Sequence, residues 1–265
     1  MGRNNRKNIA TDTLQALEQG YFNTSKGEQV QIKEIQTFAE QNTITYAPAM
    51  TDELLQNRSI KILETPTAIE VTNETSLNAT RRLINEGYTD VLCLNFASAR
   101  NAGGGFLGGS QAQEESIARA TGLYPCLMQA PDYYNTNRKV KSCFYTDYMI
   151  YSPKVPILKD EVGNYLAGLV TASFITAPAV NTGVVKQREA LRLKEIEVVM
   201  KRRIGKVLAI ALEHVHSSIV LGARGCGVFQ NNPDDMARYF KEVIEGGFNN
   251  QFRQITFAIY AKNER

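Results

Sequence analysis

The order of apolar segments along the 265-residue chain predicts an α/β protein. From Thr67 onward, short β-type runs alternate with helix-type runs, which is typical of a mostly parallel sheet covered by helices on both faces. One run, DVLCLNFA at 90–97, is continuously apolar, as expected for a central strand buried on both sides. Residues 1–66 are less regular, and we interpret them as an N-terminal extension that packs on a main domain at 67–265 within one structural unit.

The first half of the chain contains four segments with clear signals. Residues 7–20 are expected to form a leading helix that stops at Gly20. A strand at 67–72 precedes a helix at 76–87, whose apolar residues share one face and whose end is marked by glycine. A further helix is expected at 113–121, after a glycine-rich loop.

The second half predicts more strands and two helices. A long helix at 185–204 has one apolar face opposite many lysines and arginines. Another helix begins at Pro233, which suits a first helical turn, and ends near Gly246. Strands are expected at five apolar runs: 148–158, 169–178, 206–214, 217–223 and 255–260.

Composition excludes several classes of protein. A net charge of +3, from 30 basic and 27 acidic side chains, is too small for a dedicated nucleic-acid binder but is compatible with an anionic substrate. The 4 cysteines form no CxxC pair, so we expect them to be reduced and structural. No apolar stretch has the length of a signal peptide or a membrane span, and we expect a cytoplasmic, intracellular protein.

Two glycine-rich loops follow the apolar runs at 90–97 and 217–223. Ligands of parallel sheets bind at the carboxyl ends of the strands, so both loops are candidate ligand contacts. Gly103–Gly105 in one loop and GCG at 225–227 in the other lack side chains that would keep a diphosphate away from backbone amides, except for Cys226. Neither loop matches the P-loop or GxGxxG patterns, which disfavours a kinase or a nicotinamide dehydrogenase. A single GGG is equally compatible with a flexible connection, but two such loops favour a binding site.

Gln113, Glu114 and Glu115 follow at the start of the helix expected at 113–121. Two acids in a first turn are stabilised by the helix dipole, which is the common structural explanation. Beside bound phosphates, however, a carboxylate has a raised pKa, as a general acid at neutral pH requires, because free glutamate titrates near ~4.3. Adjacent helical side chains point about 100° apart, so the two acids are expected to have different roles.

These motifs resemble the signature of the microbial-type poly(ADP-ribose) glycohydrolases, in which GGG is followed by a short spacer and QEE. Here the signature is Gly103–Gly105, the seven residues FLGGSQA, and Gln113–Glu115. The resemblance extends over nearly the whole chain through three further segments: RKNIATDTLQALEQGYF, IEVTNETSLNATRRL and LGARGCGVFQNNP. It implies a macro-domain fold with N-terminal additions, in which 67–265 is the macro-type catalytic domain.

By this resemblance, the candidate catalytic residues are Glu115 and Glu114. Glu115 would protonate the ribose oxygen that leaves when the ribose–ribose bond breaks, and would then help a water molecule attack the oxocarbenium-like centre. One carboxyl that acts first as acid and then as base differs from glycosidases that divide this work between two. Glu114 would hold the distal ribose or order the catalytic loop.

The resemblance also implies the substrate contacts and partners. The two glycine loops would hold the diphosphate, Phe229 would pack on the distal ribose, and Ser98 would make a polar ribose contact. The candidate substrate-binding residues are Ser98, Gly103, Gly104, Gly105, Gln113, Gly225, Cys226, Gly227, Val228 and Phe229. The expected substrates are poly(ADP-ribose) and ADP-ribosylated proteins, with ADP-ribose released as product from chain ends, and with no cofactor, metal, DNA or membrane involved.

Two other functions remain open: a module that binds ADP-ribose without cutting it, and a hydrolase of another ADP-ribosyl linkage. Glu115 within QEE speaks against the first, because a binding module gains nothing from a carboxylate aimed at the glycosidic bond. The sequence discriminates poorly between linkages, since every such enzyme must hold the same nucleotide. We rank chain hydrolysis first because QEE differs between these classes of macro domain.

Three other features have structural explanations that we favour. His214 and His216 lie two apart at an expected strand end, but without acidic or cysteine partners they are interpreted as hydrogen-bonded histidines rather than metal ligands. The basic cluster Lys201–Arg203 with Lys206 is interpreted as a solvated helix end. Residues 72–74 are as compatible with a helix cap as with a contact to adenine.

Overall fold

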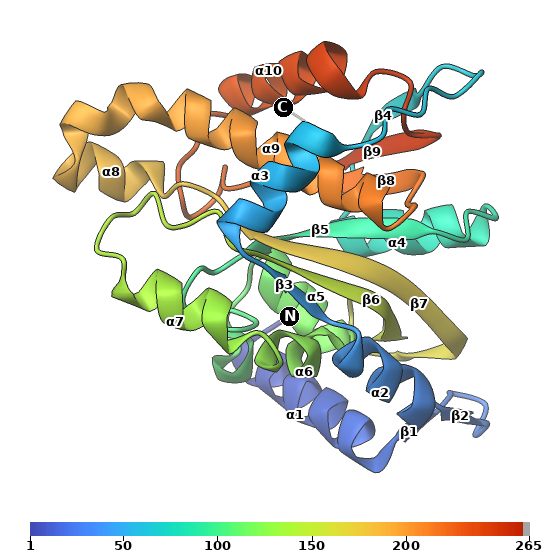
Figure 1. Ribbon diagram of the computed structural model, residues 1–265. Coiled ribbons are helices and arrows are strands. Elements are labelled where there is room, and N and C mark those ends of the chain that lie inside the picture. Colours follow the sequence, from blue (N-terminus) through green and yellow to red (C-terminus); the bar gives the residue numbers. More distant parts are fainter. Residues whose placement is uncertain (262–265) are drawn as a thin grey trace.

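The computed structural model describes residues 1–261. Its main sheet has 7 strands, with five neighbouring strands parallel and two antiparallel strands at one side (Figure 1). Across the sheet the order is β3 (Ile44–Tyr46), β6 (Met149–Lys159), β7 (Tyr165–Pro178), β5 (Val91–Ala97), β8 (Ser218–Leu221), β9 (Gln254–Ala258) and β4 (Ala68–Thr72). The predicted α/β fold with a mixed, mostly parallel sheet is confirmed.

Helices cover both faces of this sheet. One face carries α3 (Pro48–Asn57), α9 (Ile196–Glu213) and α10 (Pro233–Val243). The other carries α4 (Ser76–Asn85), α5 (Gln113–Ala120), α6 (Leu123–Met128) and α7 (Pro131–Lys139). In Figure 1, α3, α9 and α10 lie toward the top of the view, and α5, α6 and α7 lie toward the bottom.

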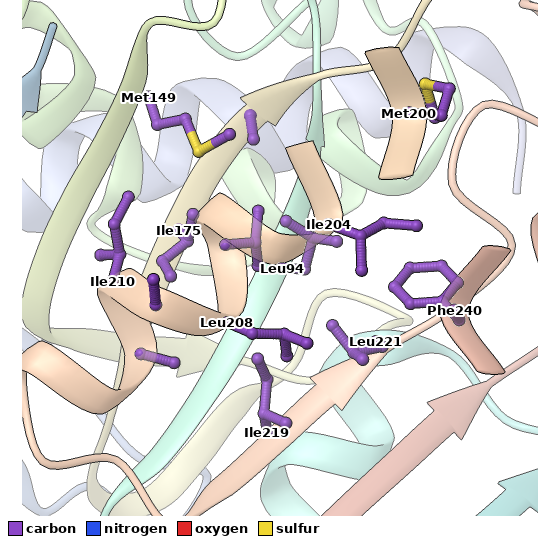
Figure 2. Close-up of a cluster of buried hydrophobic side chains, with 14 of the residues drawn as sticks. Leu94, Met149, Ile175, Met200, Ile204, Leu208, Ile210, Ile219, Leu221 and Phe240 are labelled. Carbon is purple, nitrogen blue, oxygen red and sulfur yellow. The ribbon is translucent and has the colours of Figure 1, made fainter. Parts of the chain in front are cut away.

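Alternate side chains of the central strand β5 supply the two cores, as strand geometry requires. Leu92 and Leu94 face the α9 layer and belong to the same buried cluster as Leu208. Figure 2 shows Leu94 and Leu208 within this cluster. Val91 and Cys93 face the opposite layer of helices. All four are buried, which explains why the run at 90–97 is continuously apolar.

The segment before residue 67 contributes to the sheet and to both layers. Within it, β3 pairs antiparallel with β6 and so forms one edge of the sheet. Helix α1 (Arg3–Gln19) packs against α5 and a short 3-10 turn at Phe106–Gly108, while α2 (Lys33–Gln41) packs on β6. A separate two-stranded hairpin joins α1 to α2 through β1 (Tyr21–Asn23) and β2 (Gln29–Gln31).

The strand predicted at 206–214 is wrong, because these residues form the second half of α9. Lys206 to Ala211 are all buried, and all of them except Lys206 are apolar, so this part of the helix lacks the helical period that would identify it. The helix predicted at 185–204 is also interrupted. It comprises α8 (Thr182–Arg188), a 3-10 turn at Ala190–Glu195 and the beginning of α9.

The other predicted elements are confirmed, with ends shifted by a few residues. After α10 the chain continues in a π-helical turn at Ile244–Phe248, which contains the glycines that were expected to end the helix. Among the described residues, no helix is both long and apolar enough to cross a lipid bilayer.

Candidate active site

A cavity of about 630 Å³ lies at the carboxyl ends of β5, β7 and β8. Its walls come from the loops that follow these strands, from the start of α5 and from the segment between α7 and β6. The structure brings most of the predicted site residues together around it: Ser98, Gln113, Glu114, Glu115, Gly225, Gly227, Val228 and Phe229. This position agrees with the general rule that ligands of parallel sheets bind beyond the strand ends.

Glu114 is buried at the base of the cavity, with 3% of its surface exposed. Its Oε1 accepts a hydrogen bond from Asn95 Nδ2 (3.2 Å), and its Oε2 accepts one from the backbone N–H of Ser98 (2.7 Å). Burial raises the pKa of Glu114 to about 8 against the opposing effect of these hydrogen bonds, and the charge of Glu115 adds to the rise. At neutral pH this carboxyl therefore retains its proton most of the time.

Glu115 is less buried than its neighbour and is held by the glycine loop. The backbone N–H of Gly105 donates to Glu115 Oε1 at 3.0 Å. Among residues 1–261 this is the one hydrogen bond to its carboxylate, so Oε2 is available to a ligand. The arrangement suits a group that must exchange a proton with a bound molecule.

The GGG segment packs against α5, and none of its glycines lines the cavity. Gly103 and Gly104 have φ of 67° and 60°, a left-handed conformation that favours glycine. A Cβ on Gly104 would lie 2.4 Å from Glu115 Oε1, and one on Gly103 would lie 2.8 Å from the ring of Phe106. The absence of side chains at these glycines therefore leaves room for the Glu115 carboxylate and for Phe106.

Gln113 fixes the start of α5 to the end of β5. Its Oε1 accepts from the backbone N–H of Phe96 (2.8 Å), and its Nε2 donates to Leu94 O (2.7 Å) and Ser76 Oγ (3.2 Å). These bonds satisfy the side chain completely at the edge of the buried strand. The glutamine of QEE thus anchors the two acids that follow it.

Helix α1 closes over the outer side of the glycine loop. Arg3 Nε donates to Gly108 O and Arg6 Nε donates to Gly109 O, each at 2.8 Å. Gly109 has φ 73°, and a Cβ there would lie 2.4 Å from Arg3 O. Residues from the N-terminal segment therefore hold the loop that holds Glu115.

The second glycine loop forms the opposite wall. Gly225 (φ 73°) lies against Asn231, and a Cβ on it would be 2.2 Å from Asn231 Nδ2. Phe229 and Tyr145 both line the cavity, and their rings lie beside each other with centroids 6.2 Å apart. Cys226 does not line the cavity and instead packs against the apolar core under α9.

Two arginines are fully buried beside this wall. Arg224 precedes Gly225, and its guanidinium and that of Arg203 both donate to Pro178 O at the end of β7. Arg224 Nε and Nη1 have no partner among the described residues. Burial and the charge of Arg203 lower the pKa of Arg224 to about 9, so it still carries a positive charge at neutral pH.

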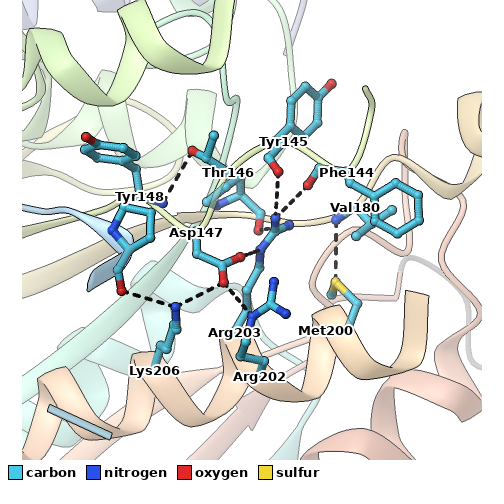
Figure 3. Close-up of polar contacts among 12 residues, drawn as sticks. Phe144, Tyr145, Thr146, Asp147, Tyr148, Val180, Met200, Arg202, Arg203 and Lys206 are labelled. Carbon is cyan, nitrogen blue, oxygen red and sulfur yellow. Dashed lines mark hydrogen bonds and ion pairs between the residues drawn. The ribbon is translucent and has the colours of Figure 1, made fainter. Parts of the chain in front are cut away.

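The basic cluster on α9 is not the solvated helix end that the sequence suggested. Arg203 Nε donates to Asp147 Oδ1 (2.8 Å), and Lys206 Nζ donates to Asp147 Oδ2 (3.0 Å), with Arg203 and Lys206 each 1% exposed (Figure 3). Burial alone would raise the pKa of Asp147, but Arg202, Arg203 and Lys206 hold it well below its usual range. The cluster ties α9 to the segment that carries Tyr145, because Arg203 also donates to Tyr145 O.

The two histidines lie elsewhere and are hydrogen-bonded. His214 Nε2 is 2.8 Å from Tyr46 Oη, and His216 Nε2 is 2.9 Å from Tyr151 Oη. Burial lowers the pKa of both rings, to about 4 for His214. Within 1–261 there is no group of three His, Cys, Asp or Glu side chains that could hold a metal ion.

Sequence reasoning missed several cavity residues, among them Arg100, Asn101, Gln111 and Tyr145. Tyr145 lies between α7 and β6, in a stretch without a recognisable pattern. The sequence did contain a sign of Asn95, which contacts Glu114, because Asn95 is the single polar residue of the apolar run at 91–97. A buried amide inside such a strand indicates a polar partner, here Glu114.

Comparison with known proteins identifies the family. Residues 10–160, more than half of the chain, match the family model described as "Microbial-type PARG, catalytic domain". A comparison with curated proteins gave no match.

Solved structures extend this similarity over the whole fold. The poly(ADP-ribose) glycohydrolase (PARG) of Thermomonospora curvata is 39% identical, with a TM-score of 0.93 over 97% of this chain and 94% of that chain. The same enzyme bound to the inhibitor ADP-HPD gives 38% identity and a TM-score of 0.91 over 98% of this chain and 94% of that one. The PARG of Deinococcus radiodurans in complex with ADP-ribose gives 41% identity and a TM-score of 0.81 over 86% and 92%. The chain therefore belongs to the microbial-type poly(ADP-ribose) glycohydrolase family.

Proposed function

We propose that this poly(ADP-ribose) glycohydrolase cuts ribose–ribose O-glycosidic bonds and releases ADP-ribose, with Glu115 as general acid and then general base. One observation carries the proposal. Glu115 sits in the cavity with one carboxylate oxygen held by the Gly105 amide, beside a second carboxyl whose pKa is raised to about 8. An ADP-ribose binding module has no use for this pair of acids.

In the proposed mechanism, the carboxyl of Glu115 first donates a proton and later regains one. Protonated Glu115 gives its proton to the ribose oxygen of the leaving unit as the C–O bond breaks, which leaves an oxocarbenium-like ribose in the cavity. The resulting carboxylate then takes a proton from a water molecule that attacks the same carbon. Glu115 returns to its starting state, and the products are ADP-ribose and a polymer shorter by one unit.

Glu114 has a supporting role in this proposal. Its pKa near 8 keeps it mainly neutral at pH 7, which avoids a second negative charge next to Glu115 and the substrate. Its hydrogen bond from Ser98 N orders the loop that follows β5. From that position a protonated carboxyl can also donate to a hydroxyl of the distal ribose.

The remaining predicted contacts are proposed for the rest of the substrate. Gly225 and Gly227 would present backbone amides to the diphosphate, and Ser98 and Phe229 would contact the distal ribose. The structures of the Deinococcus radiodurans enzyme with ADP-ribose and the Thermomonospora curvata enzyme with ADP-HPD support a ligand of this class. Release from chain ends is proposed from the family resemblance.

Poly(ADP-ribose) attached to modified proteins is the proposed physiological substrate. We also propose an intracellular location for the enzyme. The cysteines support this location, because all four are free, as is usual in a reducing compartment, and Cys93 and Cys126 are buried.

The test compares the wild type with Glu115→Gln on automodified poly(ADP-ribose) polymerase, while polymer length and free ADP-ribose are followed together. Calorimetry measures ADP-ribose binding by both proteins, and Glu53→Gln, an exposed site on α3, is the matched control. We expect Glu115→Gln to bind ADP-ribose without cutting the polymer, while Glu53→Gln retains full activity. A wild type that binds ADP-ribose and leaves the polymer intact would assign the chain to a binding module or to another linkage.

A further inference from the structure

Four exposed basic residues lie on the loop after β5 and at the end of α7 with the residues that follow it, and we call them the basic rim: Arg100, Arg138, Lys139 and Lys141. Arg100 lines the cavity itself. Its Nη2 donates to Val140 O (3.3 Å), and Arg138 Nε donates to Arg100 O (2.9 Å). These two bonds hold the end of α7 and the residues after it against the loop that follows β5.

The charges of this rim are not neutralised within the described part of the chain. None of its four side chains forms an ion pair with an acid there, whereas the surface arginines Arg82, Arg192 and Arg238 each pair with two or more. Glu189 accepts hydrogen bonds from Ser142 and Cys143, which follow the rim in the sequence, and this carboxylate is paired with Arg192.

The dipole of α7 explains only part of this pattern. Arg138 and Lys139 lie in its last turn, where positive charge is stabilising. Arg100 and Lys141 lie outside the helix, so the dipole gives no reason for their charges. A concentration of unpaired positive charge at one opening is suited to an anionic ligand.

Within the rim, Arg100 lies on the catalytic side of the cavity. Directly after Arg100, the chain turns so that Gly104 N donates to Asn101 O (3.0 Å), and the next amide, that of Gly105, donates to Glu115. The bond that Glu115 breaks joins the unit in the cavity to the next unit of the polymer. Arg100 lines the same cavity as Glu115, so it is positioned to meet that next unit where it leaves the cavity.

We propose that the basic rim binds the diphosphate of the ADP-ribose unit on the leaving side of the scissile bond. The inference rests on the proposed function and adds to it a second subsite, extending from Arg100 to the exposed end of α7, that recognises the polymer but not the monomer. Each further unit of the polymer brings another doubly charged diphosphate, which the unpaired cations attract. The rim thereby favours polymer over free ADP-ribose, the product that would otherwise compete for the cavity.

The experiment uses Lys139→Gln/Lys141→Gln, which removes two charges and leaves Arg100 in place. The control, Lys26→Gln/Lys61→Gln, removes two exposed lysines of the N-terminal segment, which is not part of the rim. For each protein, KM and kcat on poly(ADP-ribose) are measured over a range of salt concentrations, and the Kd for ADP-ribose is measured by calorimetry. Thermal unfolding checks that all proteins are folded.

We expect the rim variant to raise KM for the polymer roughly tenfold at low salt, with kcat and the Kd for ADP-ribose unchanged. The slope of log KM against log salt should become smaller, because fewer ions are displaced on binding. The control should match the wild type. The proposal is overturned if polymer KM is unchanged, if the control shows the same rise, or if affinity for ADP-ribose falls in parallel. Failure of the wild type to cut polymer would refute the proposed function instead.

Discussion

Replacing Gly104 by alanine tests whether the glycine loop positions Glu115. A Cβ there would lie 2.4 Å from Glu115 Oε1 and 2.9 Å from Glu115 Cδ, whereas ordinary contacts begin at 3.4 Å. The carboxylate would therefore have to move by about 1 Å, and misplacement of this size in an active site costs on the order of 10²-fold in rate. The left-handed backbone at Gly104 (φ 60°) would add a loss of folding stability of about 1–2 kcal/mol.

Two matched variants separate these effects. Gly27 also has a left-handed φ (82°), but a Cβ added to it would have no other atom within 4 Å, so Gly27→Ala should lose stability and keep full activity. Gly108 lies in the same loop as Gly104 without a left-handed φ, and the nearest neighbour of a Cβ there, Arg3 Nη2, would be 3.8 Å away. Gly108→Ala should leave both properties nearly unchanged.

The assay measures kcat on poly(ADP-ribose), the Kd for ADP-ribose and the free energy of unfolding for all three variants. We expect kcat to fall about 100-fold in Gly104→Ala alone. Wild-type kcat in a folded Gly104→Ala protein would refute the idea that this loop sets the position of Glu115. A loss of activity in Gly27→Ala of the same size would show that backbone strain, and not displacement of the carboxylate, is responsible.

Three further predictions concern the buried charges. Because the pKa of Glu114 is raised from 4.5 to about 8, the folded state binds this proton more tightly than the unfolded state. Its contribution to stability is then complete below pH 4.5 and is lost as pH rises through 8, so Glu114→Gln should flatten the fall in denaturant-measured stability between pH 5 and pH 8. Arg224→Met removes a buried charge with two unpartnered nitrogens, so the thermal midpoint should stay equal or rise, while ADP-ribose binding should weaken roughly tenfold. Adenosine, which lacks phosphate, is the control ligand, and its binding should not change. Equal loss of affinity for both ligands would contradict an electrostatic attraction between Arg224 and the phosphates. Asp147→Asn leaves Arg203 buried without its anion and Lys206 with the more exposed Asp52 alone, so unfolding by urea should show a loss of about 3–5 kcal/mol. A loss below about 1 kcal/mol would mean that water reaches these cations.

The sequence predicted the sheet well because its strands carry strong local signals. β5 is apolar except for Asn95 and is followed by a glycine loop, which identified both a central strand and the edge where the cavity lies. The second half of α9 gave the same apolar signal for a different reason, since a helix buried on all sides has no polar face. Composition alone could not distinguish these two kinds of burial.

The sequence predicted only part of the site, because a local motif does not record tertiary contacts. A glycine motif shows where the backbone takes unusual conformations, but it does not show what lies close to it. Gly103–Gly105 were expected to face a diphosphate, while in the structure their nearest neighbours include Glu115 and Phe106. Tyr145 and Arg100 reach the cavity through tertiary contacts with segments far away in the sequence, which no local pattern records.

The contact of α1 with the catalytic loop has a consequence for inactivation. The two hydrogen bonds that Arg3 and Arg6 make to Gly108 and Gly109 join segments about 100 residues apart, and much of the surrounding helix is exposed. A peripheral helix of this kind can detach in a local opening that costs less free energy than global unfolding. Catalysis would then cease while the sheet and both cores are still intact, so mild heat or urea should inactivate the enzyme before it unfolds.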